Sequence, residues 1–352
     1  MRPRYFLALI GAAGFALASG SAFGAASSCK MVRLAEWPVQ TKRNALIVDG
    51  AINGKSVGVM LDTGAGNTQI LRSAAVQLGL TRESIGNFRQ FGVGGETDVE
   101  VTVVDEFKIG ESKRRNWSMF VAGENDLGGD VGVILGEDFF RKVDVEFDLA
   151  HNMVRLYEPK DCEGVSLAYW TQERPSVADI APVDETRPQI VVTVLINGRQ
   201  VRALLDSGAS TSVLDKYEAA QAGVTPETPG VVPAGPAFGM GRKGVDSWVA
   251  PIQSITIGDE MIRDTTLRFS DLFRDATYTP GGSRIPRKVD ELQPMLLGAD
   301  FLRSHRVLVS HSQSKIYYTY VGGPIFQTAR APEPRSTPAQ PGSAPPQFDF
   351  KP

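Results

Sequence analysis

The sequence predicts an all-β protein in which one β-rich unit occurs twice. First, residues 45–71 align with residues 189–215 at a constant offset of 144 and without a gap. Second, β-branched runs in both copies end at an Asn-Gly pair, which is typical of tight hairpins. Third, helical patterning is confined to two short segments, 73–78 and 216–222. The 352 residues are enough for two domains of ordinary size.

The N-terminus has the pattern of a secretory signal peptide, which we place at residues 1–24. Arg2 and Arg4 precede an apolar run of small residues, and Ala22-Phe23-Gly24 offers a cleavage site. A membrane anchor is the alternative reading, but the run is shorter than the ~20 residues that span a bilayer. We therefore expect an exported protein, periplasmic or secreted, with no transmembrane segment in the mature chain.

The first repeat is expected at residues 25–165 and the second at residues 188–322. Both consist mainly of short strands, because β-branched residues cluster there and alternate with polar ones. In the first repeat the expected strands are 45–52, 57–61, 99–104 and 144–149. In the second repeat they are 190–196, 201–205 and 315–321.

Three segments lie outside this repeated pattern. Residues 166–187 carry prolines and many charges and are predicted to be a linker. Residues 271–292 form a polar stretch without a counterpart in the first repeat, so we expect an added loop there. Residues 323–352 are rich in Pro, Ala, Ser and Gln and are predicted to be a disordered tail.

Composition limits the partners and cofactors. The chain has 37 basic and 40 acidic residues, and this balance argues against nucleic acid as a partner. The two cysteines, Cys29 and Cys162, bracket the first repeat, and an exported chain would allow them to form a disulfide. Lipid modification of Cys29 is the alternative. The three histidines show no metal-ligand spacing, and we expect neither a metal nor another cofactor.

Three motifs occur once in each half and suggest chemistry. An aspartate on a glycine turn after an apolar run occurs at Asp62 and again at Asp206. Two such aspartates that face each other can share one proton and activate a water molecule. The other two motifs are a glycine-rich tip and an apolar-apolar-Gly triplet. The tips are Gly92, Val93, Gly94 and Gly95, then Gly239, Met240 and Gly241; the triplets are Ile134-Leu135-Gly136 and Leu296-Leu297-Gly298.

With these motifs the chain resembles the retropepsin-like (clan AA) aspartic proteases, in a tandem two-repeat form. The resemblance implies two acid-protease β-barrel repeats that form a pepsin-like pseudo-dimer within one chain, as a monomer. It implies an aspartic endopeptidase that acts on peptide or protein substrates. Asp62 and Asp206 would be the catalytic residues, supported within their loops by the neighbouring residues of each motif. These supporting residues are Thr63, Gly64, Ser207 and Gly208.

The resemblance also implies that the glycine tips are flaps that close over substrate. An ordinary glycine turn is the alternative at both places, and a solvated basic turn is the expected state of Arg242 and Lys243. In the first repeat Gly66 replaces the hydroxyl residue that the second supplies as Ser210. This difference leaves open whether both aspartates are active. A silent peptide-binding protein on the same fold, a self-processing protease and a homodimer remain alternatives.

Overall fold

The fold was examined in a computed structural model. It describes residues 29–42, 44–123, 127–128, 131–182, 189–239, 241, 243–272, 277–278, 287–288 and 292–326. The predicted signal peptide and the tail from residue 327 onward lie outside the described residues. So does most of the added loop, of which the described parts are residues 271, 272 and 292 and the two short paired strands β19 (Thr277–Tyr278) and β20 (Arg287–Lys288).

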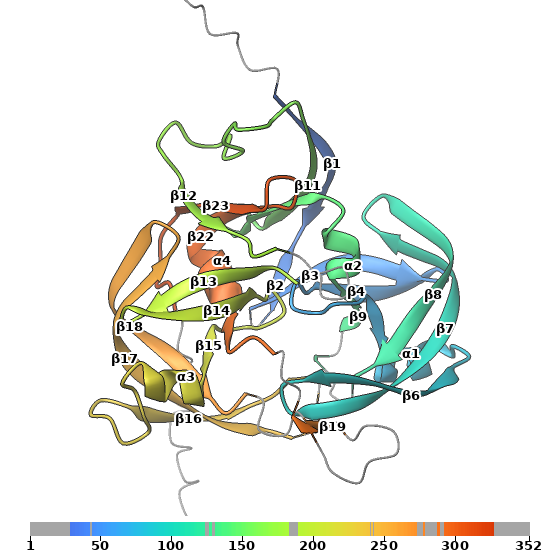
Figure 1. The fold of residues 1–352 in the computed structure, drawn as a ribbon. Coiled ribbons are helices and arrows are strands. Elements are labelled where there is room, and N and C mark those ends of the chain that lie inside the picture. Colours follow the sequence, from blue (N-terminus) through green and yellow to red (C-terminus); the bar gives the residue numbers. More distant parts are fainter. Residues whose placement is uncertain are drawn as a thin grey trace, which may run out of the picture.

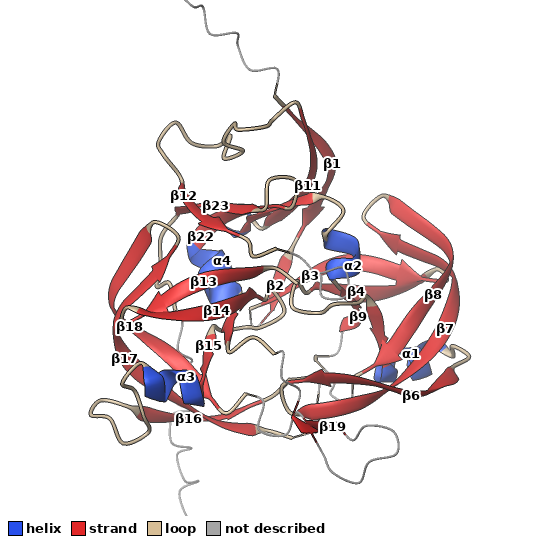
Figure 2. Ribbon diagram, in the orientation of Figure 1, coloured by secondary structure: helices blue, strands red, loops and turns tan. Residues whose placement is uncertain are grey.

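Strands dominate the described chain, which confirms the all-β class (Figure 2). The first lobe is one eight-stranded sheet that closes on itself, because β3 pairs with both β4 and β7. Its strands in spatial order are β2 (Gln40–Lys42), β3 (Ala45–Ile52), β4 (Lys55–Leu61), β9 (Val131–Leu135), β5 (Gln69–Leu71), β8 (Ser112–Ala122), β7 (Gly95–Ile109) and β6 (Glu83–Gly92).

The second lobe repeats this topology in seven strands, and β13 closes it by pairing with both β14 and β17. The order is β13 (Val191–Ile196), β14 (Arg199–Leu205), β21 (Met295–Leu297), β15 (Val213–Asp215), β18 (Glu260–Ser270), β17 (Val245–Ile257) and β16 (Val232–Ala237). The hairpins turn at the predicted Asn-Gly pairs. Asn53 and Asn197 have positive φ, as does the glycine that follows each.

A six-stranded sheet joins the two halves and lies between the lobes at the top of Figure 1. The order is β1 (Lys30–Pro38), β11 (Met153–Lys160), β10 (Asp144–Asp148), β22 (His305–Ser310), β23 (Lys315–Tyr320) and β12 (Ser176–Asp179). Strand β10 of the first half pairs directly with β22 of the second half. Because this pairing is built from both halves, neither repeat completes the sheet alone.

Strand β12 lies within the segment predicted to be a linker, 166–187. Residues 176–179 pair with β23, and the side chains of Leu167 and Ala168 are buried. The described part of this segment is therefore an integral part of the joining sheet and not only a connection. A disulfide links Cys29, next to β1, to Cys162, just after β11.

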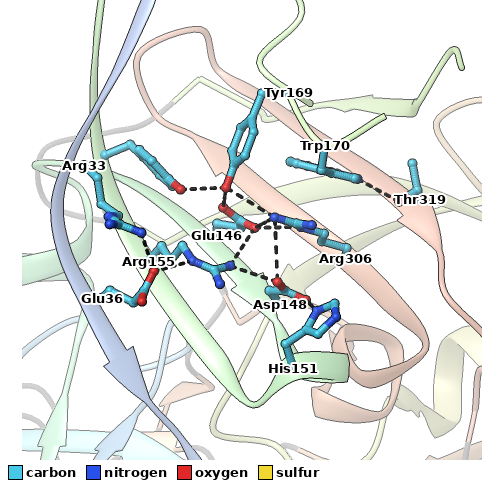
Figure 3. A network of polar contacts seen from close by, with 11 residues as sticks. Arg33, Glu36, Glu146, Asp148, His151, Arg155, Tyr169, Trp170, Arg306 and Thr319 are labelled. Carbon is cyan, nitrogen blue, oxygen red and sulfur yellow. Dashed lines mark hydrogen bonds and ion pairs between the residues drawn. The ribbon is translucent and has the colours of Figure 1, made fainter. Parts of the chain in front are cut away.

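One face of the joining sheet carries an ion network in which the carboxylates of Glu146 and Asp148 are buried (Figure 3). Glu146 on β10 accepts hydrogen bonds from Arg155 at 3.2 Å, Arg306 at 2.7 Å and the hydroxyl of Tyr169 at 2.5 Å. Arg155 also donates to Asp148 at 2.8 Å. Arg306 comes from β22, so these charges connect the two halves. Such paired charges fix an orientation more than they add net stability.

Helices are few and short: α1 (Arg72–Leu78), α2 (Glu137–Phe140), α3 (Lys216–Gln221) and α4 (Ala299–Ser304), with a 3₁₀ turn at Leu149–His151. Two of them, α1 and α3, occupy the segments in which helical patterning was found. Within the described residues, no helix has the length and apolar character needed to span a membrane. The inward faces of the three sheets share one continuous apolar core.

Candidate active site

Each candidate aspartate directly follows a strand whose end is fixed by a neighbouring strand. Asp62 follows β4 and donates its backbone N–H to the carbonyl of Leu135 at 3.0 Å. Asp206 follows β14 and donates in the same way to Leu297 at 2.9 Å. Both leucines belong to the predicted apolar triplets and are fully buried. The triplets are therefore core residues that hold the base of each aspartate loop.

The two aspartate loops are joined by reciprocal hydrogen bonds. The hydroxyl of Thr63 donates to the carbonyl of Leu205 at 2.6 Å and accepts from the N–H of Ser207 at 3.0 Å. The hydroxyl of Ser207 donates to the carbonyl of Leu61 at 2.8 Å and accepts from the N–H of Thr63 at 3.0 Å. Both side chains are fully buried. Each hydroxyl thus braces the opposite loop, and the two loops form one rigid unit.

Within each loop the aspartate carboxylate is held by its own backbone. Oδ1 of Asp62 accepts from the N–H groups two and three residues further on, at 2.9 and 3.0 Å. Oδ1 of Asp206 accepts from the corresponding N–H groups at 3.0 and 2.9 Å. These bonds set the orientation of each carboxylate without using a side chain.

The glycine after each motif hydroxyl is required by a close approach. A Cβ on Gly64 would lie 2.5 Å from Cγ of Asp206, and one on Gly208 would lie 2.3 Å from Cγ of Asp62. Neither glycine has a positive φ, so backbone freedom is not the reason for it. Each carboxyl group instead packs onto the glycine of the opposite loop, which brings the two carboxyl groups close enough for each to affect the pKa of the other.

Burial raises the pKa of both aspartates. For Asp206 the nearby charge of Asp62 adds to the effect of burial. For Asp62 burial is again the largest cause, opposed by the hydrogen bond from Asp206 and by the backbone N–H groups. Two adjacent carboxyl groups cannot both ionise easily, so they titrate as a pair and retain one proton above the ordinary aspartate range.

A further pair of acids supports the loops from below. Asp138 accepts from the backbone N–H of Thr68 at 2.8 Å and from its hydroxyl at 2.7 Å. Asp300 accepts from Ser212 at 2.9 Å and 2.6 Å in the same way, and burial raises the pKa of Asp300 to about 6. Their position after the triplet suggests helix caps, but neither is the N-cap residue of α2 or α4. They hold the aspartate loops instead.

The glycine-rich tips are the turns of two hairpins that touch each other. Gly92 and Gly95 pair at the end of β6 and β7, with Gly94 at a φ of +89° in the turn between them. The N–H of Gly241 donates to the carbonyl of Val93 at 3.0 Å. The N–H of Lys243 donates to the carbonyl of Gly94 at 3.3 Å.

This contact brings the two tips together on the side of the molecule away from the joining sheet (Figure 1). A Cβ on Gly239 would lie 2.6 Å from Cβ of Val93, so Gly239 also belongs to the contact. Met240 and Arg242 of the second tip lie outside the described residues.

One buried acid near the site is not apparent from the motifs. Glu137 follows the first triplet and donates its N–H to the carbonyl of Ala65 at 2.8 Å. Its side chain is fully buried, and neither carboxyl oxygen has a hydrogen-bond partner among the described residues. Nε2 of His311 is 3.7 Å away. Burial, together with the charges of Asp62 and Asp138, raises the pKa of Glu137 to about 9.

The signal for Glu137 is present in the alignment of the two halves. The second repeat has Ala299 at this position, and its N–H makes the matching bond to the carbonyl of Ala209 at 2.8 Å. A position that is Ala in one copy and a buried acid in the other marks a difference between the two loops. Among the described residues, no group of His, Cys, Asp or Glu is arranged to hold a metal ion.

Comparisons with known proteins found matches to two protein families and to solved structures. Residues 48–142 match a family described as gag-polyprotein putative aspartyl protease, and residues 192–301 match a family described as aspartyl protease. No curated protein sequence matches the chain. Among solved structures, the crystal structure of aspartic proteinase from Irpex lacteus is similar at 12% identity and a TM-score of 0.44. The match covers 81% of this chain and 97% of that one.

The two family matches together span more than half of the chain, and each contains one of the two aspartate loops. They fall on the two lobes in sequence order. The chain therefore belongs to the retropepsin-like aspartyl proteases, with two family domains in tandem on one polypeptide.

Proposed function

We propose that this chain is an aspartic endopeptidase with a single active site, to which each lobe contributes one aspartate. The observation that carries the proposal is the pairing of the Asp62 and Asp206 carboxyl groups, each packed on the glycine of the opposite loop. The pair is assembled within one chain, so the proposed enzyme acts as a monomer. Peptides or proteins are its substrates.

The proposed reaction needs no covalent intermediate. The ionised member of the pair removes a proton from a water molecule held between the carboxyl groups, while the protonated member donates to the carbonyl oxygen of the scissile bond. The raised pKa of both groups supports this division, because one proton stays on the pair at working pH. Closure of the two touching tips over the substrate would exclude bulk water.

Digestion of a diverse peptide library from pH 3 to 8 tests the proposal. The wild-type protein should cut peptides, and Asp62→Asn and Asp206→Asn should each reduce the rate by roughly 1,000-fold or more. Asp105→Asn, the same change at an exposed position, is the matched control and should leave cutting unchanged. A peptide mimic with a hydroxyl group at the scissile position should inhibit. Absence of any cut by the wild type, or normal cutting by either variant, would contradict the proposal.

Export is a second part of the proposal. It is supported by the signal-like N-terminus and by the disulfide between Cys29 and Cys162, a bond typical of oxidising compartments. N-terminal sequencing of the protein from fractionated cells should place the mature start near residue 25, in the periplasmic or secreted fraction. Recovery of the uncleaved chain from the cytosol would refute it.

A further inference from the structure

Arg268 lies in the second lobe, on a strand that pairs with the strand following the Asp206 loop. It is on β18, where it is the register partner of Val213 on β15 and of Val249 on β17. Partner residues on adjacent strands share one face of a sheet. Arg268 therefore shares a face with Val213, and its side chain is only 8% exposed.

That face meets both the Asp206 loop and the tip of the first hairpin. Val213 forms a small apolar cluster with Leu272 and Leu296, against which Ala209 and Val93 pack. Ala209 belongs to the Asp206 loop, and Val93 is at the tip of the first flap. A substrate held beneath the flap would therefore contact this cluster.

The guanidinium of Arg268 has no acidic partner among the described residues. Nη1 donates to the hydroxyl of Ser247 at 2.7 Å, whereas the buried Nε has no hydrogen-bond partner there. The charge of Asp300 acts on Arg268 from a distance, but the Asp300 carboxylate is engaged by Ser212.

Other partly buried arginines differ, since Arg155 and Arg306 both bind carboxylates. An unpaired buried cation is costly and is stabilised by an anion that can reach it. Arg268 is thus prepared for a carboxylate that the described residues do not supply.

The matching position in the first lobe carries no charge. The register partner of Gln69 on β5 is Phe120 on β8, the position that corresponds to Arg268. Only one of these two matching positions therefore carries a cation, and a substrate bound across both lobes would meet unequal surroundings.

We propose that Arg268 determines specificity by binding an acidic substrate side chain on the second lobe's side of the scissile bond. This inference rests on the proposed peptidase function and names its substrate class: peptides with Asp or Glu at one fixed position. A guanidinium and a carboxylate can form two parallel hydrogen bonds, which would favour an acid over its amide at that position.

The test compares matched peptides that differ only by Asp against Asn, or Glu against Gln, at the position enriched in the library digest. At pH 6 the wild type should cut the acidic peptide roughly 10–100-fold faster in kcat/KM. Arg268→Leu should bring this ratio close to one, and Arg268→Lys should give an intermediate ratio. Arg263→Leu, at an exposed position on the same strand, is the control and should keep the wild-type ratio.

The outcomes separate this inference from the proposed function. A wild type that cuts peptides without an acidic preference at any position would overturn the role of Arg268 and leave the peptidase intact. A preference that survives in folded Arg268→Leu would do the same. A wild type that cuts nothing refutes the peptidase itself. If Arg268→Leu does not fold, Arg268→Lys decides, because it keeps the charge but loses the planar guanidinium: a ratio equal to that of the wild type in this variant would overturn the role of Arg268.

Discussion

The Asp62 loop and the Asp206 loop make the same backbone contacts but rest on different residues. Beneath Asp62 lies Glu137, a buried acid next to His311, and beneath Asp206 lies Ala299, which has no charge. The reciprocal hydroxyl bonds are nearly identical in length on the two sides. The hydrogen bonds between the loops are thus the same on both sides, whereas the residues that pack beneath the loops differ. The two aspartates therefore have unequal electrostatic surroundings.

The largest expected effect on stability comes from the disulfide beside the joining sheet, which ties only the first half. Only the first half has a covalent tie, the disulfide between residues 133 apart in sequence. Replacing Cys29 and Cys162 by serine should lower the free energy of unfolding by about 3–5 kcal/mol, because the unfolded chain regains the freedom of a long loop. Urea unfolding of the wild type and the double variant measures this. An unchanged midpoint would mean that hydrogen bonds alone hold β1 in place.

The next largest effect on stability tests whether the hydroxyls of Thr63 and Ser207 contribute equally to holding the two loops together. Thr63→Val and Ser207→Ala each leave a buried N–H and a buried carbonyl without a partner, so each should cost about 2–4 kcal/mol of unfolding free energy. Thr63→Ser retains the hydroxyl and should cost less than about 1 kcal/mol. Thermal unfolding of the single and double variants gives the coupling. Additive costs would contradict a single cooperative unit.

Glu137 provides a smaller, pH-dependent test of the asymmetry. Its pKa is raised from 4.5 to about 9 in the folded state. The contribution of Glu137 to the free energy of unfolding is therefore greatest below pH 4.5 and is lost as the pH rises toward 9. Glu137→Gln should therefore match the wild type near pH 4 and be more stable by about 1–3 kcal/mol at pH 8.

Urea unfolding at both pH values measures the effect of Glu137→Gln. Several charged groups lie near Glu137 and His311 and also affect their pKa values. Asp62, Asp138 and Arg141 act on Glu137, and Asp144 acts on His311. Equal destabilisation at both pH values would show that the pKa of Glu137 is not raised in the folded protein. The matched change in the second half, Ala299→Glu, should lower stability at pH 8 more than at pH 4.

The smallest effect concerns the contact between the two tips. A Cβ on Gly241 would lie 2.1 Å from the carbonyl carbon of Gly94, so Gly241→Ala should push the tips apart. We expect KM to rise about 3–10-fold with little change in stability. Gly86→Ala, at a positive φ but with open space around it, introduces strain without this clash. A similar rise in KM for both variants would argue against tip contact as the cause.

Local patterns were sufficient for the elements that depend on neighbouring residues. Asn53-Gly54 and Asn197-Gly198 marked the hairpins, and the repeated Asp motif marked both loops. Strand β12 was not predicted, because its proline- and charge-rich surroundings are typical of a linker. Its pairing with β23 joins residues about 140 positions apart, and local sequence carries no trace of such a contact.

The contacts of the residues that pack beneath the aspartate loops could not be predicted from local sequence patterns, for the same reason. Glu137 is an acid beside a turn, a setting that is usually solvent-exposed, and its burial depends on the fold of both halves. The unpaired state of Arg268 likewise emerges only when β15, β17 and β18 are brought together. Asp138 and Asp300 were recognisable as a repeated pair, but their hydrogen bonds to Thr68 and Ser212 were not.

The pairing of β10 with β22 has a consequence for the order of events during synthesis. Glu146 on β10 and Arg306 on β22 are 160 residues apart in sequence. During synthesis, β10 and the first lobe therefore leave the ribosome long before β22, the partner strand of β10, has been made. The Asp206 loop also waits for a late strand, because the backbone N–H of Asp206 binds the carbonyl of Leu297 on β21. A nascent or prematurely terminated chain therefore has no complete site. The fold itself therefore delays assembly of the candidate site until the chain has been made beyond Leu297.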